Sequence, residues 1–235
     1  MNPAFIFARG GSKGLKEKNI KEFYGKPLIA WTIELAKKID YVDRVIVSTD
    51  CENIKEVSIA FGAEVPFLRP KELSEDNSPE WGAWQHAIEF ISNESGKLQE
   101  TFISLPVTAP LRKREDVERC INMFKDASCD IVITASESSR NPYFNMIKIN
   151  EYGNAQIAIN GDDKIYNRQE APITYDISTI AYVAKPSFIM NSSNIFEGNV
   201  KVVTIPAERS SDIDTLHDFE VAEFLFERLS LNEQY

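Results

Sequence analysis

A short apolar run at the start of the chain is followed directly by a glycine-rich, cationic loop. Residues 4–7 read Ala-Phe-Ile-Phe, and three glycines stand among basic side chains in residues 8–19. Glycine lets backbone N–H groups approach an anion closely, and basic side chains supply positive charge. Six basic residues and only two acidic ones lie between positions 9 and 26, although the chain carries a formal net charge of −10. A strand that ends in such a loop is typical of polyphosphate binding; a solvated basic loop is the alternative.

The spacing of this loop differs from the best-known phosphate loops. It matches neither Gly-x-x-x-x-Gly-Lys-Ser/Thr nor Gly-x-Gly-x-x-Gly, so neither a P-loop NTPase nor a dinucleotide-binding fold is indicated. It resembles the opening loop of the CMP-N-acylneuraminate synthetase (acylneuraminate cytidylyltransferase) family, Ala-Arg-x-Gly-Ser-Lys-x-x-x-x-Lys-Asn. The matching residues are Arg9, Gly11, Ser12, Lys13, Lys18 and Asn19. The resemblance implies that these residues bind the nucleotide, and that Arg9, Lys13 and Lys18 neutralise its phosphates during catalysis.

Strand-like apolar runs alternate with helical periodicity along the first 136 residues. The expected strands are 4–8, 44–49, 64–67, 101–105 and 130–134, and the expected helices are 27–38, 52–61, 81–91 and 115–124. This alternation predicts a parallel sheet with helices on both faces. The resemblance implies a three-layer, Rossmann-like α/β nucleotidyltransferase fold with a mostly parallel sheet.

The pattern changes in the second half of the chain. Residues 143–175 are polar and turn-rich, with turn signals at Glu151-Tyr152-Gly153-Asn154 and Asn160-Gly161-Asp162-Asp163. We expect a small β-rich lobe, inserted at about residues 138–177, within a single cytidylyltransferase domain of residues 1–235. The resemblance implies that this lobe mediates a homodimer.

The chain is expected to return to the sheet after the lobe. Residues 180–184 and 200–204 are apolar runs that predict strands, and residues 215–229 predict a final helix.

Two aspartates stand just before this final helix. In an extended segment Asp212 and Asp214 point to the same side, and paired carboxylates suit Mg²⁺ that also binds substrate phosphates. A helix cap formed by Asp214 is the alternative. The family carries Asp-x-Asp at this place, so the resemblance implies that both residues bind Mg²⁺ (or Mn²⁺) and that Asp212 is catalytic.

The stretch Phe67-Leu68-Arg69-Pro70 and the residues after it resemble the base-recognition region of the family. A guanidinium can donate a hydrogen bond to the cytosine O2 atom. Arg69 is therefore the expected base-reading residue, with Asn77 and Ser78 beside it. A surface loop in which Ser78 caps the next helix is the alternative.

Two other stretches resemble the sugar-binding region of the family. Residues 105–112 read Leu-Pro-Val-Thr-Ala-Pro-Leu-Arg where the family reads Leu-Gln-Pro-Thr-Ser-Pro-Leu-Arg, and residues 168–172 fit Arg-Gln-x-x-Pro. The expected sugar-binding residues are Thr108, Arg112, Arg168, Gln169 and Lys148. A purely structural role for Arg112 and an exposed strand lysine at Lys148 are the alternatives.

The chain departs from the family at two places in this region. Pro106 replaces the glutamine, and Ile177-Ser178-Thr179 stands where Asn-Gly is common. Both departures bear on the sugar, so the sequence does not name it.

Composition limits the partners. An acidic chain is a poor match for nucleic acid, and no apolar stretch is long enough to span a bilayer. The N-terminus lacks the pattern of a secretory signal. Three cysteines without a close pair favour a reduced, cytoplasmic setting.

The resemblance implies the reaction. It is the transfer of CMP from CTP to the anomeric hydroxyl of a nonulosonic (sialic-acid-like) acid, with release of pyrophosphate, in the biosynthesis of a cell-surface polysaccharide. One alternative is a nucleotidyltransferase of the same fold for a 3-deoxy-octulosonate-type acid or for another base. Another is a non-catalytic nucleotide- or sugar-binding subunit. The sequence singles out no general base.

Overall fold

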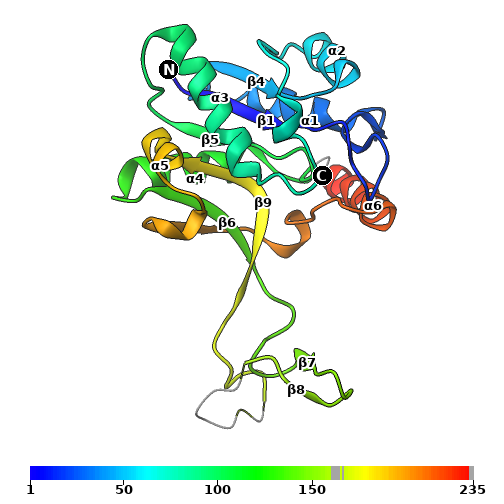
Figure 1. Cartoon of the computed structure of the whole chain (residues 1–235). Coiled ribbons are helices and arrows are strands. Elements are labelled where there is room, and N and C mark those ends of the chain that lie inside the picture. The colour runs from blue at the N-terminus through cyan, green and yellow to red at the C-terminus, as the bar shows by residue number, and fades with distance from the viewer. Residues whose placement is uncertain (160–164, 166, 233–235) are drawn as a thin grey trace.

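The computed structural model describes residues 1–159, 165 and 167–232, with side chains up to residue 229. Within these residues, a six-stranded sheet forms the centre of the molecule (Figure 1). Its order is β10 (Val200–Thr204), β6 (Ile131–Glu137), β9 (Tyr175–Ala184), β5 (Phe102–Ser104), β1 (Pro3–Phe7) and β4 (Arg44–Ser48). Strand β9 runs antiparallel to both of its neighbours, and the other adjacent pairs are parallel. The expectation of a mostly parallel α/β sheet is confirmed.

Helices cover both faces of the sheet. They are α1 (Leu28–Ala36), α2 (Glu52–Ala60), α3 (Glu80–Ser95), α4 (Arg114–Asp126), α5 (Pro186–Asn191) and α6 (Leu216–Asn232). Successive side chains of β1 point to opposite faces of the sheet. Ala4 and Ile6 belong to the hydrophobic cluster on one face, and Phe5 belongs to the cluster on the other. The first cluster packs against α1, α2, α4 and α6, and the second packs against α3 and α5.

Short elements complete the body. They are η1 (Lys18–Ile20), the hairpin of β2 (Glu22–Phe23) and β3 (Lys26–Pro27), η2 (Lys71–Leu73), η3 (Ile195–Glu197) and η4 (Ala207–Arg209). In the part of the chain that is described, no helix is both long and apolar enough to cross a membrane.

The strand expected at residues 64–67 does not form. Only isolated bridges join Glu64 to Ile46 and Leu68 to Thr49 along the edge of the sheet beside β4. Pro66 lies between these bridges and has no backbone N–H to donate, so it interrupts the ladder. The other expected strands and helices are present, with ends shifted by a few residues.

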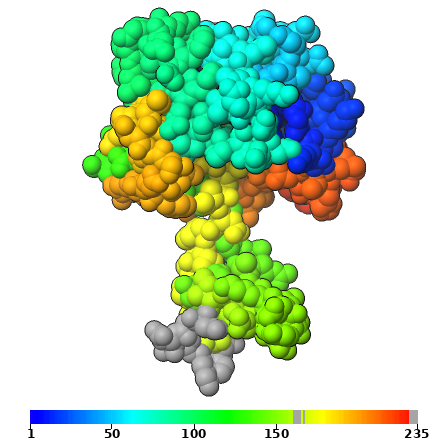
Figure 2. All heavy atoms as spheres, in the orientation of Figure 1, coloured from blue at the N-terminus to red at the C-terminus, as the bar shows by residue number. Residues whose placement is uncertain are grey.

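The inserted lobe projects from the body (Figures 1 and 2). The long strands β6 and β9 lead to it, and it carries the hairpin of β7 (Ile147–Ile149) and β8 (Ala155–Ile157). The turn expected at residues 151–154 joins these two strands, with Gly153 at φ +80°. The turn expected at residues 160–163 lies outside the described residues.

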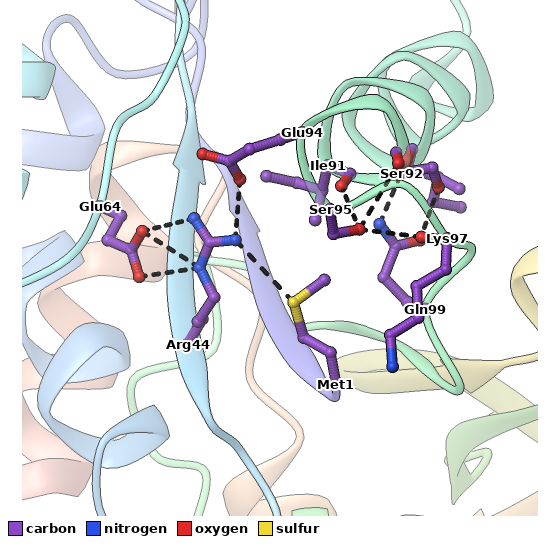
Figure 3. Close-up of polar contacts among 10 residues, drawn as sticks. Met1, Arg44, Glu64, Ile91, Ser92, Glu94, Ser95, Lys97 and Gln99 are labelled. Carbon is purple, nitrogen blue, oxygen red and sulfur yellow. Dashed lines mark hydrogen bonds and ion pairs between the residues drawn. The ribbon is translucent and has the colours of Figure 1, made fainter.

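Arg44, the first residue of β4, joins three segments at the end of the sheet shown in Figure 3. Its guanidinium donates from Nε and Nη2 to Glu64, with an Nη2–Oε2 distance of 2.6 Å, and from Nη1 to Glu94 at 2.9 Å. Hydrogen bonds to Glu64 and Glu94 raise the pKa of Arg44 although desolvation opposes them. The network therefore holds the chain after α2 and the end of α3 against the edge strand.

We expect Arg44→Met to lower the melting temperature by roughly 2–4 °C, which corresponds to about 1 kcal/mol in a chain of this size. The effect is modest because Glu64 and Glu94 are partly exposed. Differential scanning calorimetry measures it, with Lys97→Met, an exposed residue beyond the end of α3, as the control. Equal melting temperatures for both variants would contradict the clamping role of Arg44.

Candidate active site

The cationic loop after β1 is fixed at both ends by hydrogen bonds. The Gly10 N–H donates to Asp50 Oδ1 at 2.8 Å, and Asp50 lies just beyond the carboxyl end of β4. The Asn19 side-chain amide in η1 donates to the Arg9 carbonyl oxygen at 2.9 Å. Asn19 is buried, so it holds the loop in shape from below. The loop therefore stands at the carboxyl edge of the parallel strands, where ligands bind in open α/β sheets.

The same loop touches the segment that carries the two aspartates. Lys18 Nζ donates to the Ile213 carbonyl oxygen at 2.5 Å and lies 3.1 Å from Asp214 Oδ1. Gly14 is pressed against this segment, because a Cβ at Gly14 would lie 2.2 Å from the Asp214 carbonyl oxygen. Figure 1 shows the resulting neighbourhood, with α6 beside the N-terminal loop.

A cavity of about 440 Å³ lies where loop and aspartate segment meet. The predicted site residues that line it are Arg9, Ser12, Lys13, Lys18, Asn19, Thr108 and Asp214. Gly14, Phe7 and Thr215 complete its wall. One concave surface thus combines three cations, loop backbone and a carboxylate, which suits an anionic ligand with a bound cation. Gly11 is exposed and lies outside this lining.

A second cavity of about 280 Å³ shares Phe7 and Arg9 with the first. Arg69 lines it, and its guanidinium donates to the Ser48 hydroxyl oxygen at 3.0 Å and to the Ser48 carbonyl oxygen at 2.5 Å. Desolvation by burial lowers the pKa of Arg69. The arginine expected to read a base is therefore held by two hydrogen bonds at the wall of a cavity next to the first one.

The other two expected base-reading residues differ from Arg69. Ser78 lines the second cavity, but its hydroxyl donates to the Glu72 carbonyl oxygen at 2.6 Å. It does not cap α3, because Pro79 occupies the N-cap position. Asn77 is exposed and does not line the cavity.

Asp214 does not cap α6. Thr215 and Asp218 form that cap, since Asp218 Oδ2 accepts from the Thr215 N–H at 2.8 Å and the Asp218 N–H donates to Thr215 Oγ1 at 3.3 Å. Hydrogen bonds from Thr215 lower the pKa of Asp218. The alternative considered for Asp214 is therefore wrong, and its carboxylate faces the first cavity.

The two aspartates meet different neighbours. Asp214 is bound by Lys18, whereas Asp212 is within electrostatic reach of Glu80 and Tyr182. Among the described residues, no group of three or more His, Cys, Asp or Glu side chains could hold a metal ion. Asp214 lines the first cavity, whereas Asp212, two residues earlier, lines neither cavity. The pair still fits Mg²⁺ chemically, because this ion takes one or two carboxylates together with substrate phosphates.

Arg112 lies beneath the loop of residues 105–111 and does not line the two cavities. Its buried guanidinium donates to the Ile180 carbonyl oxygen at 2.6 Å, the Thr32 hydroxyl at 3.0 Å and the Pro106 carbonyl oxygen at 2.5 Å. Desolvation by burial lowers the pKa of Arg112 to about 9. These contacts favour the structural alternative for Arg112, in which it ties the loop to β9 and α1, over the expected sugar contact.

Thr108 belongs to the same loop but faces the first cavity. Its carbonyl oxygen accepts from the Ile213 N–H at 2.9 Å, between the two aspartates, and its hydroxyl lies 3.5 Å from that of Thr179. Thr108 therefore links the loop, β9 and the aspartate segment at one point.

The remaining expected sugar-binding residues lie on the lobe or at its base. Lys148 and Gln169 are exposed, and Arg168 Nη2 donates to the Ser138 carbonyl oxygen at 3.3 Å. None of the three lines either cavity of the cleft. Within one chain, these three residues therefore do not reach the two cavities.

Sequence reasoning missed the partner of the cationic loop. Asp76 lies 3.1 Å from Arg9 Nη1 and 2.5 Å from Lys13 Nζ, and these contacts lower the pKa of its carboxyl. The sequence placed Asp76 in the stretch that resembles the base-recognition region, but it did not indicate that this residue pairs with the cationic loop. The positive charges of Arg9 and Lys13 are therefore balanced by the Asp76 carboxylate, which comes from the segment before α3.

A glycine-rich cationic loop at the carboxyl edge of a mostly parallel sheet, bonded to a segment with two aspartates, is the arrangement expected of an α/β nucleotidyltransferase. Comparison with known proteins narrows the class. The Cytidylyltransferase family profile matches residues 4–200. Post-translational flagellin modification protein B of Campylobacter coli is 32% identical over 227 residues, which cover 96% of this chain and 95% of the relative. The chain belongs to the cytidylyltransferase family.

Other comparisons agree with this assignment. CMP-N,N'-diacetyllegionaminic acid synthase of Campylobacter jejuni is 31% identical, covering 97% of this chain and 95% of the relative. The solved structure of CMP:2-keto-3-deoxy-manno-octonic acid synthetase with CTP superposes with a TM-score of 0.73 at 18% identity, covering 97% and 98% of the two chains. The resemblance inferred from the opening loop is confirmed, and the chain is a nucleotidyltransferase.

The tight contact at Gly14 leads to a prediction. Gly14→Ala should lower the free energy of unfolding by about 1–3 kcal/mol, because the added methyl group must displace the loop or the Asp214 backbone. Urea denaturation measures the loss.

Gly11→Ala is the matched control for stability, since a Cβ there meets no atom within 4 Å. If the two variants unfold at the same urea concentration, the loop does not depend on its contact with Asp214.

Proposed function

We propose that this chain transfers CMP from CTP to the anomeric hydroxyl of a nonulosonic acid and releases pyrophosphate. The observation that carries the proposal is the 3.1 Å contact of Lys18 Nζ with Asp214 Oδ1, which joins the cationic loop and the aspartate pair in one cavity. The name of the Campylobacter jejuni relative, CMP-N,N'-diacetyllegionaminic acid synthase, supports an acidic sugar as acceptor, and 95% of that relative is covered by the match.

The two cavities suggest how CTP lies in the cleft. The cytosine would occupy the smaller cavity beside Arg69, and the triphosphate would occupy the larger one beside the loop. On binding, the β- and γ-phosphates would replace Asp76 as the partner of Arg9 and Lys13, because a triphosphate carries more charge than one carboxylate.

The chemistry rests on positioning and charge neutralisation. The sugar hydroxyl oxygen forms a bond to the α-phosphorus while the bond to the bridging oxygen breaks, and pyrophosphate leaves with that electron pair. Arg9, Lys13 and Lys18 stabilise the charge that develops on the leaving group. Thr108, Arg168, Gln169 and Lys148 are proposed to contact the sugar.

Asp212 and Asp214 are the residues that would hold Mg²⁺ or Mn²⁺ together with the substrate phosphates. Cytidylyltransferases of this kind generally use a divalent metal ion. When bound, the ion supplies positive charge at the α-phosphate.

The lobe supports a homodimer. Its exposed apolar side chains are Met146, Ile147, Ile149, Tyr152, Ile159 and Ile173, and Ile149 is 68% exposed. Exposed apolar side chains gathered on one small lobe, here called the apolar patch of the lobe, are typical of a protein interface. A second copy would cover it, and its lobe would bring Arg168, Gln169 and Lys148 to the neighbouring cleft, which these residues do not reach within one chain.

We also propose a place in the biosynthesis of surface sugars, in the cytoplasm. The relative named for flagellin modification and the legionaminic acid relative support the first part. The free thiols of Cys51, Cys120 and Cys129 are compatible with a reducing compartment.

Asp212→Asn should lower the rate of pyrophosphate release by about 10²-fold or more, because one cation ligand loses its charge. Purified protein is assayed with CTP, Mg²⁺ and a panel of nonulosonic acids that also contains 3-deoxy-octulosonate. Asp126→Asn, an exposed residue at the end of α4, is the control. Turnover with another nucleotide but not with CTP would refute the assignment of the base, and binding without turnover would favour a non-catalytic subunit.

Ile149→Glu should shift the protein from dimer to monomer, because it places a charge in the apolar patch of the lobe. Light scattering after size-exclusion chromatography measures the mass. Ile59→Glu, at an isoleucine of α2 that is 52% exposed, is the matched control and should leave the mass unchanged. A monomeric wild-type protein would contradict the proposed assembly.

A further inference from the structure

A carboxylate that the expected site residues do not include stands inside the cleft. Glu80 is the first residue of α3 and lines the smaller cavity together with Arg69 and Ser78. That cavity is continuous in its lining with the larger one through Phe7 and Arg9. Glu80 is therefore placed to touch whatever occupies the smaller cavity.

The neighbours of Glu80 locate it along the cleft. Arg69 lines the same cavity, and the charges of both Arg69 and Asp212 act on the Glu80 carboxyl. Under the proposed function, Arg69 reads the base and Asp212 lies at the α-phosphate. Since Glu80 is near both residues, its carboxylate is within reach of the part of the nucleotide that joins the base to the α-phosphate.

The negative charge of Glu80 is incompletely balanced. Its side chain is open to the cleft, but the surrounding protein desolvates the carboxyl and raises its pKa, although Trp84 and Arg69 act in the opposite direction. In the part of the chain that is described, Glu80 forms no ion pair within 4.0 Å. A carboxylate in such a position gains from additional hydrogen-bond donors.

The chemistry of a nucleotide limits which donors can arrive. Phosphates are anions and repel a carboxylate, so they do not qualify. Cytosine offers its exocyclic amine as a donor. The ribose, which connects the base and the α-phosphate, offers two adjacent hydroxyl donors that one carboxylate can accept together, and it is the part of the nucleotide that leads from Arg69 toward Asp212. The N-terminal position of Glu80 in a helix of 16 residues favours the ionised, accepting form.

We propose that Glu80 accepts hydrogen bonds from the ribose hydroxyl groups of the bound nucleotide and thereby makes the enzyme select ribonucleotides. This inference rests on the proposed function for the orientation of CTP. It adds a specificity-determining residue on α3, outside the cationic loop and the aspartate pair.

The test compares the binding of CTP with that of 2′,3′-dideoxy-CTP, which lacks both hydroxyl groups. Isothermal titration calorimetry is carried out on the full chain with Mg²⁺ and without acceptor sugar. The wild-type protein should bind CTP about 10- to 100-fold more tightly than the dideoxy analogue, as expected for hydrogen bonds to a charged acceptor. Glu80→Ala should bring this ratio close to one, mainly by lowering the affinity for CTP.

Two further variants separate the loss of the carboxylate charge from damage to the helix. Glu80→Gln keeps the size of the side chain and removes the charge, so it should retain the fold and lose most of the preference. Glu89→Gln, an exposed residue of the same helix, should keep the wild-type ratio.

The proposal is overturned if Glu80→Gln and Glu80→Ala both keep the wild-type ratio of affinities. It is also overturned if they lower the affinities for CTP and for the dideoxy analogue by the same factor. A loss of turnover at an unchanged ratio also overturns it, because Glu80 would then act in chemistry and not in ribose binding. Failure of the wild-type protein to turn over CTP concerns the proposed function instead, since the binding ratio is measured without turnover.

Discussion

The cleft depends on one contact between the two ends of the fold. Lys18, in the first loop, is bonded to Ile213 and Asp214, which stand 195 and 196 positions later in the chain. The ammonium group satisfies a backbone carbonyl and a carboxylate together, and the missing side chain of Gly14 allows the two backbones to meet. Without this contact, the cations and the aspartates would line separate surfaces.

Arg112 and Thr108 support this contact from the side. Arg112 fixes the loop after β5 through three protein acceptors, and the Thr108 carbonyl oxygen then holds the backbone of Ile213. The aspartate segment is therefore positioned largely by hydrogen bonds to its backbone, and among the described residues the one side-chain contact of Asp214 is its exposed ion pair with Lys18. The Thr215–Asp218 cap has the same effect, because it satisfies the start of α6 without using Asp214.

Much of the fold could be predicted from the sequence, because apolar periodicity records which residues face the core. The strand expected at residues 64–67 is the exception, and its cause is local. The segment does run along β4, but Pro66 has no backbone N–H to donate, so only isolated bridges form in place of a continuous strand pairing. The site was harder to predict. The cationic loop and the aspartates were visible as motifs, but the ion pairs of Asp76 with Arg9 and Lys13 join residues more than 60 positions apart. Arg112 shows the same limit, since its acceptors are carbonyl and hydroxyl oxygens that only the folded loop brings together.

The reversed direction of β9 has a consequence for how such a chain can diversify. Because β9 runs against β6, the polypeptide between them leaves and re-enters the sheet at the edge where the loop after β1 also stands. The lobe hangs from two paired strands, and its described residues take no part in the hydrogen bonds that hold Gly10, Lys18, Asn19 and Arg69 at the two cavities. Insertions, deletions and exchanges of side chains can therefore accumulate there while the machinery for the nucleoside triphosphate stays intact, so that one scaffold can be adapted to new acceptors.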